Sequence, residues 1–209
     1  MLECEKLDLP MTNAQLKRIK AGVDDKSFFN LKEIQHQLRE LLQRLEDELE
    51  LQVFYQIESQ KARFDKDPEG FWGKEIPKAF PSALPELVEA AKCYALGRNT
   101  ACVFHLMRGL EVSLSCMAKA FGVPSDHTNW QSIIEQVESR IRELPRTKPP
   151  DWKEKLEFFS QAASHFMVLK DAWRNYTAHM RGRYEEGDAL RIMDNVRGFM
   201  EKLSGRIGE

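Results

Sequence analysis

Apolar residues recur three and four positions apart along most of the chain, which is the spacing of one face of an α-helix. The first strong stripe consists of Leu31, Ile34, Leu38, Leu41, Leu45 and Leu49. Ser27 stands before it as a suitable N-cap, and no Pro or Gly follows until Pro68. The pattern predicts one long helix from about residue 28 to residue 63. Before it, residues 1–25 are expected to be a loosely ordered lead-in with a short helix around residues 13–20.

Two packing partners are open to the long N-terminal helix. A helix of ~35 residues would be ~50 Å long, so it packs along the rest of its own chain or pairs with a second chain. Its apolar stripe covers only about three heptads, which permits a coiled coil without requiring one. We expect packing within the chain, and the coiled coil stays open as the alternative.

A Pro- and Gly-rich stretch at residues 64–82 ends the first helical region. Such residues punctuate a loop, and its aromatic residues are expected to pack down as anchors. These aromatic residues are Phe71, Trp72 and Phe80. We therefore divide the chain into an N-terminal segment, residues 1–82, and a helical bundle, residues 83–209.

The chain after residue 82 has the punctuation of an up-and-down bundle of four or five helices. The expected helices span residues 83–96, 100–121, 129–144, 152–180 and 186–204. Ser82 is placed to cap the first of them, and Gly97 and Gly122 to end the first and second. No alternating run predicts a strand. The expected fold class is therefore all-α, an up-and-down helical bundle preceded by one long N-terminal helix.

Composition favours a chain that folds without a membrane. Hydrophobic residues make up 42% of the 209 residues and charged residues 31%, with a mean hydropathy of -0.52. No run reaches the roughly 18 apolar residues that span a bilayer. The N-terminus carries acids where a signal peptide carries bases. We therefore expect a cytoplasmic protein with no membrane partner.

The formal net charge of -2 does not favour binding to a polyanion through bulk charge. The charges are nevertheless unevenly distributed. Residues 32–58 carry three bases and seven acids, whereas residues 170–206 carry eight bases and six acids. A local positive site in the C-terminal part is therefore compatible with the sequence.

The four cysteines are Cys4, Cys93, Cys102 and Cys116. No two of them form a Cys-x-x-Cys pair, and the last three lie in apolar helical sequence. This distribution favours buried reduced thiols over a disulfide or zinc framework. We therefore expect no metal site and no cofactor.

The apolar helix at residues 100–121 carries His105, Arg108 and Glu111 three positions apart. That spacing places the three side chains on one slowly drifting stripe, where Arg108 and Glu111 can pair along the helix. The stripe is either the solvent-facing edge of a core helix, which is the more ordinary explanation, or part of a site.

The helix expected to end near residue 180 carries a denser polar group. The group comprises Asp171, Arg174, Asn175 and His179, followed by Arg181 and Arg183. Asp171, Asn175 and His179 are four positions apart and share one face. Arg174 lies ~140° around from His179, but its long side chain can swing toward the same side. The two following arginines extend a positive rim, although basic residues there also suit the helix dipole.

This group contains the functional groups that RNA cleavage requires. An imidazole near its reference pKa of ~6.5 can take or give a proton at neutral pH. A guanidinium can hold a phosphate through two parallel hydrogen bonds and stabilise the charge that builds on it. Because RNA carries its own nucleophile, the 2′-hydroxyl, such a site could cleave RNA without a metal. The alternative is structural, with His179 and Arg174 paired to acids inside the bundle.

The segment Arg174-Asn175-Tyr176-Thr177-Ala178-His179 resembles the signature of the HEPN superfamily. That signature is an Arg, often followed by Asn, and then a His, late in a long helix of an α-helical bundle. The wider sequence at residues 100–111 and 165–179 is similar to prokaryotic HEPN-like proteins. The resemblance covers roughly residues 83–205.

The resemblance implies a homodimeric, metal-independent endoribonuclease of the kind found in toxin–antitoxin and antiphage defence systems. It implies that Arg174 contacts the scissile phosphate, that His179 serves as acid, base or phosphate ligand, and that Asn175 orients the site. Supporting roles would fall to Asp171, Arg108 and Glu111, and RNA contacts to Arg181 and Arg183. The implied partners are RNA and a second copy of the chain, together with an antitoxin or a nucleotidyltransferase.

Two other functions stay open. Some HEPN domains have lost catalysis, so the chain is alternatively a non-catalytic HEPN-like module that dimerises and binds a nucleotide or a protein. A further alternative assigns the function to the helix at residues 28–63, as an adaptor coiled coil. Exposure of Arg174 and His179 at a subunit contact would favour the enzyme, and burial within one protomer would favour the module.

Overall fold

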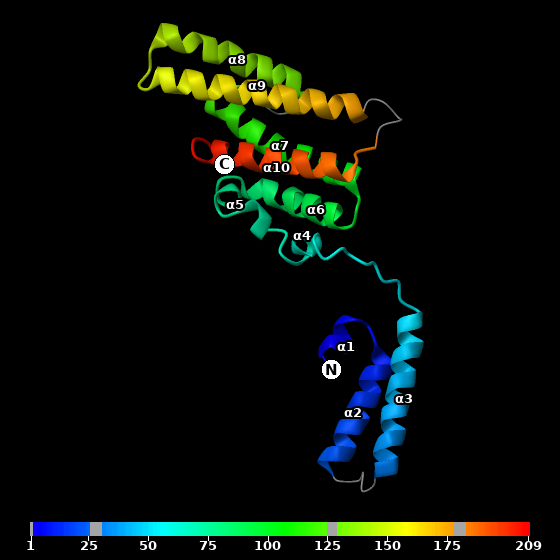
Figure 1. Cartoon of the computed structure of the whole chain (residues 1–209). Coiled ribbons are helices and arrows are strands. Elements are labelled where there is room, and N and C mark those ends of the chain that lie inside the picture. Colours follow the sequence, from blue (N-terminus) through cyan, green and yellow to red (C-terminus); the bar gives the residue numbers. More distant parts are fainter. Residues whose placement is uncertain (1, 26–30, 125–128, 178–182) are drawn as a thin grey trace. The chain divides into compact units, whose positions relative to one another are not determined.

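The computed structural model describes residues 2–25, 31–124, 129–177 and 183–209, with the backbone alone at 2–3 and 172–177. Every regular element in these ranges is helical and none is a strand, which confirms the predicted all-α class (Figure 1). The chain divides into two compact units, Met1–Gln56 and Ile57–Glu209.

The first unit is a helical hairpin. A short helix, α1 (Leu2–Lys6), precedes α2 (Pro10–Asp24) and α3 (Leu31–Glu50), which lie side by side (Figure 1). The loosely ordered lead-in predicted at residues 1–25 is therefore wrong, and the short helix expected at 13–20 is only part of α2. Periodicity missed this helix because the residues that it buries include Thr12, Asn13 and Gln15, which are polar.

The helix predicted at residues 28–63 is too long, because α3 ends at Glu50 and helix returns only at α4 (Ala62–Lys66). The large apolar side chains at residues 51 and 53–55 are all exposed. They do not continue a single apolar face, so tertiary packing provides little stabilisation that would prolong the helix.

Glu48 of α3 caps the N-terminus of α2. Its carboxylate oxygens accept hydrogen bonds from the backbone N–H groups of Met11, at 2.6 Å, and Thr12, at 2.8 Å. Burial alone would raise the pKa of Glu48, but the contacts with Thr12 and Met11 outweigh it, and the pKa lies below its ordinary value. Pro10, at the start of α2, has no N–H and needs no such partner.

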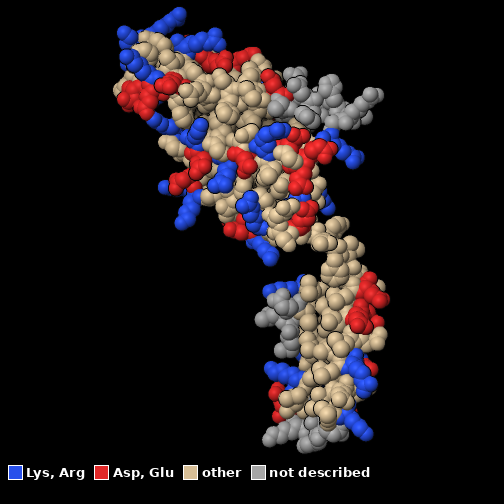
Figure 2. Space-filling model, in the orientation of Figure 1, with Lys and Arg blue, Asp and Glu red and all other residues tan. Residues whose placement is uncertain are grey.

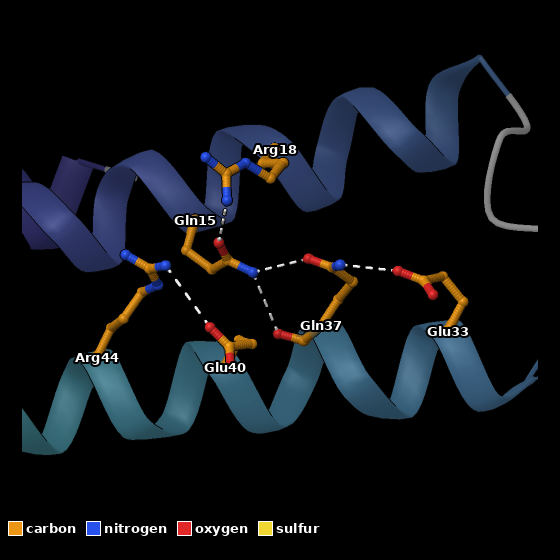
Figure 3. Close-up of polar contacts among 6 residues, drawn as sticks. All are labelled: Gln15, Arg18, Glu33, Gln37, Glu40 and Arg44. Atoms are coloured by element: carbon orange, nitrogen blue, oxygen red, sulfur yellow. Dashed lines mark hydrogen bonds and ion pairs between the residues drawn. The ribbon is translucent and has the colours of Figure 1, made fainter.

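The contact between α2 and α3 is polar along its middle. Gln15 of α2 donates to the side-chain oxygen of Gln37 at 2.8 Å, and Gln37 donates to Glu33 at 2.8 Å (Figure 3). Arg18 donates to Gln15 at 3.3 Å. The helix α3 thus packs within its own chain, as expected, through these polar contacts together with the half-buried Leu41 and Leu45.

The predicted apolar row on α3 is only partly covered: Leu41, Leu45 and Leu49 are half-buried, whereas its first part remains exposed. Leu31, Ile34, Leu38 and Leu42 are between 38% and 70% exposed. An amphipathic helix in a globular protein normally turns such a row toward the core. The hairpin therefore presents an apolar surface that its own helices do not cover.

The Pro- and Gly-rich stretch packs onto the second unit. It contains the end of α4, the 3₁₀ helix η1 (Gly70–Trp72), α5 (Glu75–Ala79) and the 3₁₀ helix η2 (Pro81–Ala83). Trp72 and Phe80 are buried, and Trp72 Nε1 donates to the carbonyl of Leu87 at 3.0 Å, as expected of anchors. The division between the units falls earlier than the boundary predicted at residue 82, since residues 57–82 belong with the bundle.

Five longer helices complete the second unit. They are α6 (Leu84–Ala95), α7 (Asn99–Ala120), α8 (Trp130–Thr147), α9 (Trp152–Thr177) and α10 (Glu186–Ser204). They match the five predicted helices closely, although α8 continues through Pro145. The central helix α7 contacts α6, α8 and α10, and α8 pairs with α9 (Figure 1).

The predicted caps agree with the structure in part. Gly97 and Gly122 follow α6 and α7 with φ of 68° and 63°, as expected for helix ends. Ser82 does not cap α6; its backbone N–H and hydroxyl donate to the Glu209 carboxylate at 2.8 and 2.6 Å. The predicted cap Ser27 lies outside the described residues.

Among the described helices, α7 is long and apolar enough to cross a membrane, judged by length and composition alone. The sequence pattern did not indicate this. Within its most apolar window, 61% of the residues are buried inside the second unit. Leu106, Leu110 and Met117 are fully covered by neighbouring elements. A position in the core accounts for the apolar composition of this helix.

The helices α6 and α7 approach closely at Gly109. A Cβ on Gly109 would lie 2.8 Å from Cδ2 of Leu87, which is fully buried. Only a residue without a side chain leaves room for Leu87 at this crossing. The approach brings the polar edges of the two helices together.

Candidate functional site

The Arg174–His179 motif begins at the C-terminal end of α9. Arg174 and Asn175 belong to the last described turn of this 26-residue helix. Their side chains, and the residues His179 and Arg181, lie outside the described residues. Arg183, which follows the motif, is exposed.

Contacts with other helices anchor the chain on both sides of the motif. On α9, the buried Lys170 donates to the side-chain oxygen of Gln131 on α8. After the motif, the backbone N–H of the buried Tyr184 donates to the Thr100 hydroxyl of α7 at 3.3 Å. The segment that carries the motif is therefore held at both flanks by the bundle.

Asp171, a predicted supporting residue, lies one turn before Asn175. Its carboxylate is 3.3 Å from Nζ of Lys170, and its side chain is exposed. The ion pair holds the carboxylate beside the anchored lysine. Asp171 thus has a described structural partner on its own helix.

A second anchor follows the motif at the start of α10. The buried Lys61 donates to the Glu186 carboxylate at 2.6 Å and to the Glu58 carboxylate at 3.2 Å. The hydrogen bond to Glu186 outweighs the opposing effect of burial and raises the pKa of Lys61. The lysine therefore links the segment before α4 to the first turn of α10.

The polar stripe on α7 is organised by a carboxylate that the sequence did not single out. Glu86 of α6 accepts from Nε of Arg108 at 2.6 Å, and its other oxygen lies 2.7 Å from Nδ1 of His105. Burial alone would raise the pKa of Glu86, but the hydrogen bonds with His105 and Arg108 outweigh it and hold the pKa below its ordinary value.

The pairing predicted between Arg108 and Glu111 is wrong. Arg108 turns to Glu86, and Glu111 accepts a hydrogen bond from Nε1 of Trp130 at 2.9 Å. Both partners come from neighbouring helices, α6 and α8. Contacts with neighbouring helices therefore form in place of the Arg108–Glu111 pair that helical spacing alone allows.

Arg108 and Glu111 line a hollow of about 840 Å³ at the edge of α7. Glu86, Lys119 and Glu209 also contribute to its walls. None of the described residues of α9 lines this hollow. The two predicted supporting residues thus line one hollow, to which the described residues of α9 do not contribute.

Comparison with models of protein families, with curated proteins and with solved structures found no match. The resemblance to HEPN domains therefore rests on the motif, on the wider sequence at residues 100–111 and 165–179, and on the place of the motif late in α9.

The charge on the surface of the second unit is mixed. Figure 2 shows Lys and Arg side chains interspersed with Asp and Glu over most of the visible face, with a group of Lys and Arg at the upper end of this unit. Residues 57–209 carry 23 Lys and Arg against 22 Asp and Glu, so this unit has almost no formal net charge.

Three residues with metal-binding side chains meet at the edge of α6 and α7, although the sequence predicted no metal site. They are Glu89, Cys93 and His105, whose ligand-type atoms all lie within 4.8 Å of one another. The spacing of Glu86, Glu89 and Cys93 on one side of α6 was the available signal. This spacing alone does not predict a metal site, because the sequence does not show that His105 of α7 faces the same side of α6.

The predicted state of the cysteines agrees with the structure. Cys93, Cys102 and Cys116 are buried free thiols. Burial raises the pKa of Cys102 to about 12. Burial, followed by the charge of Glu89, also raises the pKa of Cys93.

Proposed function

We propose that this chain is a metal-independent endoribonuclease of the HEPN type that acts as a homodimer. The observation that carries the proposal is the position of Arg174 and Asn175 in the final described turn of α9, with His179 following in the same motif. The anchors at Lys170 and Tyr184 support it, because catalytic groups need flanking structure that holds their geometry.

In the proposed reaction, Arg174 binds the scissile phosphate and His179 accepts the proton of the 2′-hydroxyl. The 2′-oxygen forms a bond to phosphorus as the bond to the 5′-oxygen breaks. The products are a 2′,3′-cyclic phosphate and a 5′-hydroxyl. Asn175 orients the two reacting groups, and Arg181 and Arg183 hold the adjoining phosphates.

The departing 5′-oxygen needs a proton, so the reaction uses an acid as well as a base. One chain contributes one motif histidine, which serves as the base. A second copy of the chain supplies the second imidazole, in its protonated form. This requirement is the chemical reason for proposing a homodimer.

Cleavage of RNA in the presence of EDTA tests the proposal. We expect wild-type protein to cut RNA, and Arg174→Ala or His179→Ala to lower the rate about 100-fold or more, as loss of one acid–base or electrostatic group does. Matched controls are His165→Ala, at an exposed histidine of α9, and Arg142→Ala, at an exposed arginine of α8. Both controls should cut at the wild-type rate.

Two results would contradict the enzyme. One is equal cleavage by the wild type and both motif variants, which would indicate a contaminating nuclease. The other is the absence of cleavage by the wild type on a pool of RNAs of varied sequence and secondary structure.

A second candidate is a non-catalytic module that dimerises and binds a partner, and the exposed row on α3 favours it. Leu31, Leu38 and Leu42 are each about half exposed or more, whereas α3 contacts α2 through another side, which includes Gln37. Rows of this kind are often covered by another helix. A second copy of the hairpin offers an identical apolar row, which makes it a suitable partner.

Molar mass in solution tests this candidate. We expect a dimer that Leu38→Glu converts to a monomer, whereas Glu46→Gln, an exposed position on the same helix, leaves it a dimer. A dimer that cuts no RNA supports the module. A monomeric wild type would contradict both the dimerising module and a nuclease site shared between two subunits.

A further inference from the structure

The edge of α6 and α7 gathers metal-binding side chains that the proposed nuclease does not use. Glu89 and Cys93 lie one turn apart on α6, with Sγ of Cys93 3.9 Å from Oε1 of Glu89. His105 of α7 brings a ring nitrogen to the same place, and the three ligand-type atoms all lie within 4.8 Å of one another.

These separations are close to those of a bound metal ion. With Zn–S of about 2.3 Å and Zn–N or Zn–O of about 2.0–2.1 Å, tetrahedral ligand atoms lie roughly 3.3–3.8 Å apart. The Cys93–Glu89 separation of 3.9 Å already lies near this range, and the exposed Glu89 side chain has room to rotate toward an ion.

Glu86 orients the imidazole for such an ion. Its carboxylate oxygen lies 2.7 Å from Nδ1 of His105, so Nδ1–H can donate to it and Nε2 carries the free lone pair. A histidine held by a carboxylate in this way is the usual arrangement at zinc sites. Arg108 neutralises Glu86 at 2.6 Å, which leaves Glu89 and Cys93 as the anionic groups for a cation.

We propose that Glu89, Cys93 and His105 bind one Zn²⁺ ion, which links α6 to α7 through side chains that the proposed nuclease reaction does not use. Cys93 binds as the thiolate and its proton passes to solvent, while water takes the fourth position. The sulfur and nitrogen donors favour Zn²⁺ over Mg²⁺ and Ca²⁺, which prefer oxygen ligands.

The burial of the three residues suits entry from solvent. Cys93 is only 6% exposed and forms the floor of the site, whereas Glu89 is exposed and His105 is half-buried. An ion can therefore reach the sulfur past the carboxylate. Because the ion joins two helices, its binding should also stabilise the folded second unit.

Titration of the metal-stripped full chain with Co²⁺, followed by displacement with Zn²⁺, tests the site. We expect one equivalent of Co²⁺ to bind with a thiolate-to-metal charge-transfer absorption, and Zn²⁺ to remove that absorption. Cys93→Ser should abolish the absorption. Glu89→Gln and His105→Gln should weaken binding at least tenfold, and Glu86→Gln by about 10–100-fold through loss of the carboxylate that orients His105.

Cys116→Ser is the matched control, because Cys116 is also a buried free thiol of the second unit but lies outside the group. It should keep the absorption and the stoichiometry of the wild type. Glu89→Gln changes an exposed side chain, so it tests the site even where Cys93→Ser fails to fold.

The proposal is overturned if the wild type shows no thiolate absorption with Co²⁺, or if Cys93→Ser keeps that absorption. It is also overturned if Cys116→Ser loses it, or if Glu89→Gln binds as tightly as the wild type. Each readout is a binding measurement, so its result does not depend on whether the chain cleaves RNA.

Discussion

Gly109 lies directly against Leu87, so that a Cβ on Gly109 would be 2.8 Å from Leu87 Cδ2. Leu87 is fully buried and has little freedom to move aside. The pair thereby maintains the spacing of α6 and α7 at which Glu86 reaches both His105 and Arg108.

We expect Gly109→Ala to destabilise the second unit despite the better helix propensity of Ala. Overpacking a core costs about 1–3 kcal/mol, against a propensity gain of about 1 kcal/mol. The control is Gly198→Ala in α10, where an added Cβ meets no atom within 4 Å. Thermal unfolding should show a lower Tm for the first variant and a higher Tm for the second. A higher Tm for Gly109→Ala would contradict the tight crossing.

Lys61→Met should loosen the start of α10, because it removes the hydrogen bond to Glu186. A loss of about 1 kcal/mol corresponds to a Tm lower by about 2–4 °C for a unit of this size. Lys78→Met, at an exposed lysine of α5, is the control and should leave the Tm unchanged. An unchanged Tm in Lys61→Met would show that the ion pair contributes nothing.

The same lysine predicts a pH dependence. Its pKa is raised in the fold, so its contribution is fully present below the ordinary value of 10.5 and is lost as pH rises through the folded value. The difference in Tm between the wild type and Lys61→Met should therefore be constant at neutral pH and shrink above about pH 10.5. A difference that grows with pH would contradict this sign.

Glu48→Gln should weaken the N-terminus of α2, since the charged carboxylate that caps Met11 and Thr12 is lost. Because the pKa of Glu48 is lowered, its contribution is present above the ordinary value of 4.5 and disappears as pH falls through the folded value. Hydrogen exchange over residues 10–24 should be faster in Glu48→Gln at neutral pH, and as slow as the wild type in Glu46→Gln. Equal protection in all three proteins would remove the capping role.

Arg183→Ala should weaken binding of RNA more than it slows cleavage of bound RNA, if the proposed function holds. Arg183 is exposed. Removal of an arginine that contacts one phosphate reduces the slope of log K against log salt concentration by about 0.7–1. RNA affinity measured at several salt concentrations checks this, with Arg142→Ala as the control. A variant with unchanged affinity and salt dependence would place Arg183 outside the RNA contact.

Much of the second unit was predictable from local pattern. The last helix was expected at residues 186–204, and α10 spans Glu186–Ser204. The first unit was less predictable, because α2 buries Thr12, Asn13 and Gln15 and so lacks an apolar stripe. The pattern also could not show where α3 ends. Residues 51 and 53–55 are exposed in the fold, so a longer helix would gain no stabilisation from burying them.

The candidate site, too, was predictable from the sequence only in part. The motif that begins at Arg174 is visible as text, and so is its place late in a long helix. The pairing of Arg108 with Glu86, and the meeting of Cys93 with His105, are not visible there. They join residues of two helices, and sequence spacing carries no information on which turns lie opposite each other.

The sequence by itself determined the helical class, the order of the main helices and the motif, because periodicity, Gly and Pro act within a few residues of where they stand. Only the tertiary structure decided which side chains share a partner. That outcome depends on the distance at which α6 and α7 cross at Gly109, and on the contact with α2 that leaves Leu31, Ile34, Leu38 and Leu42 of α3 exposed.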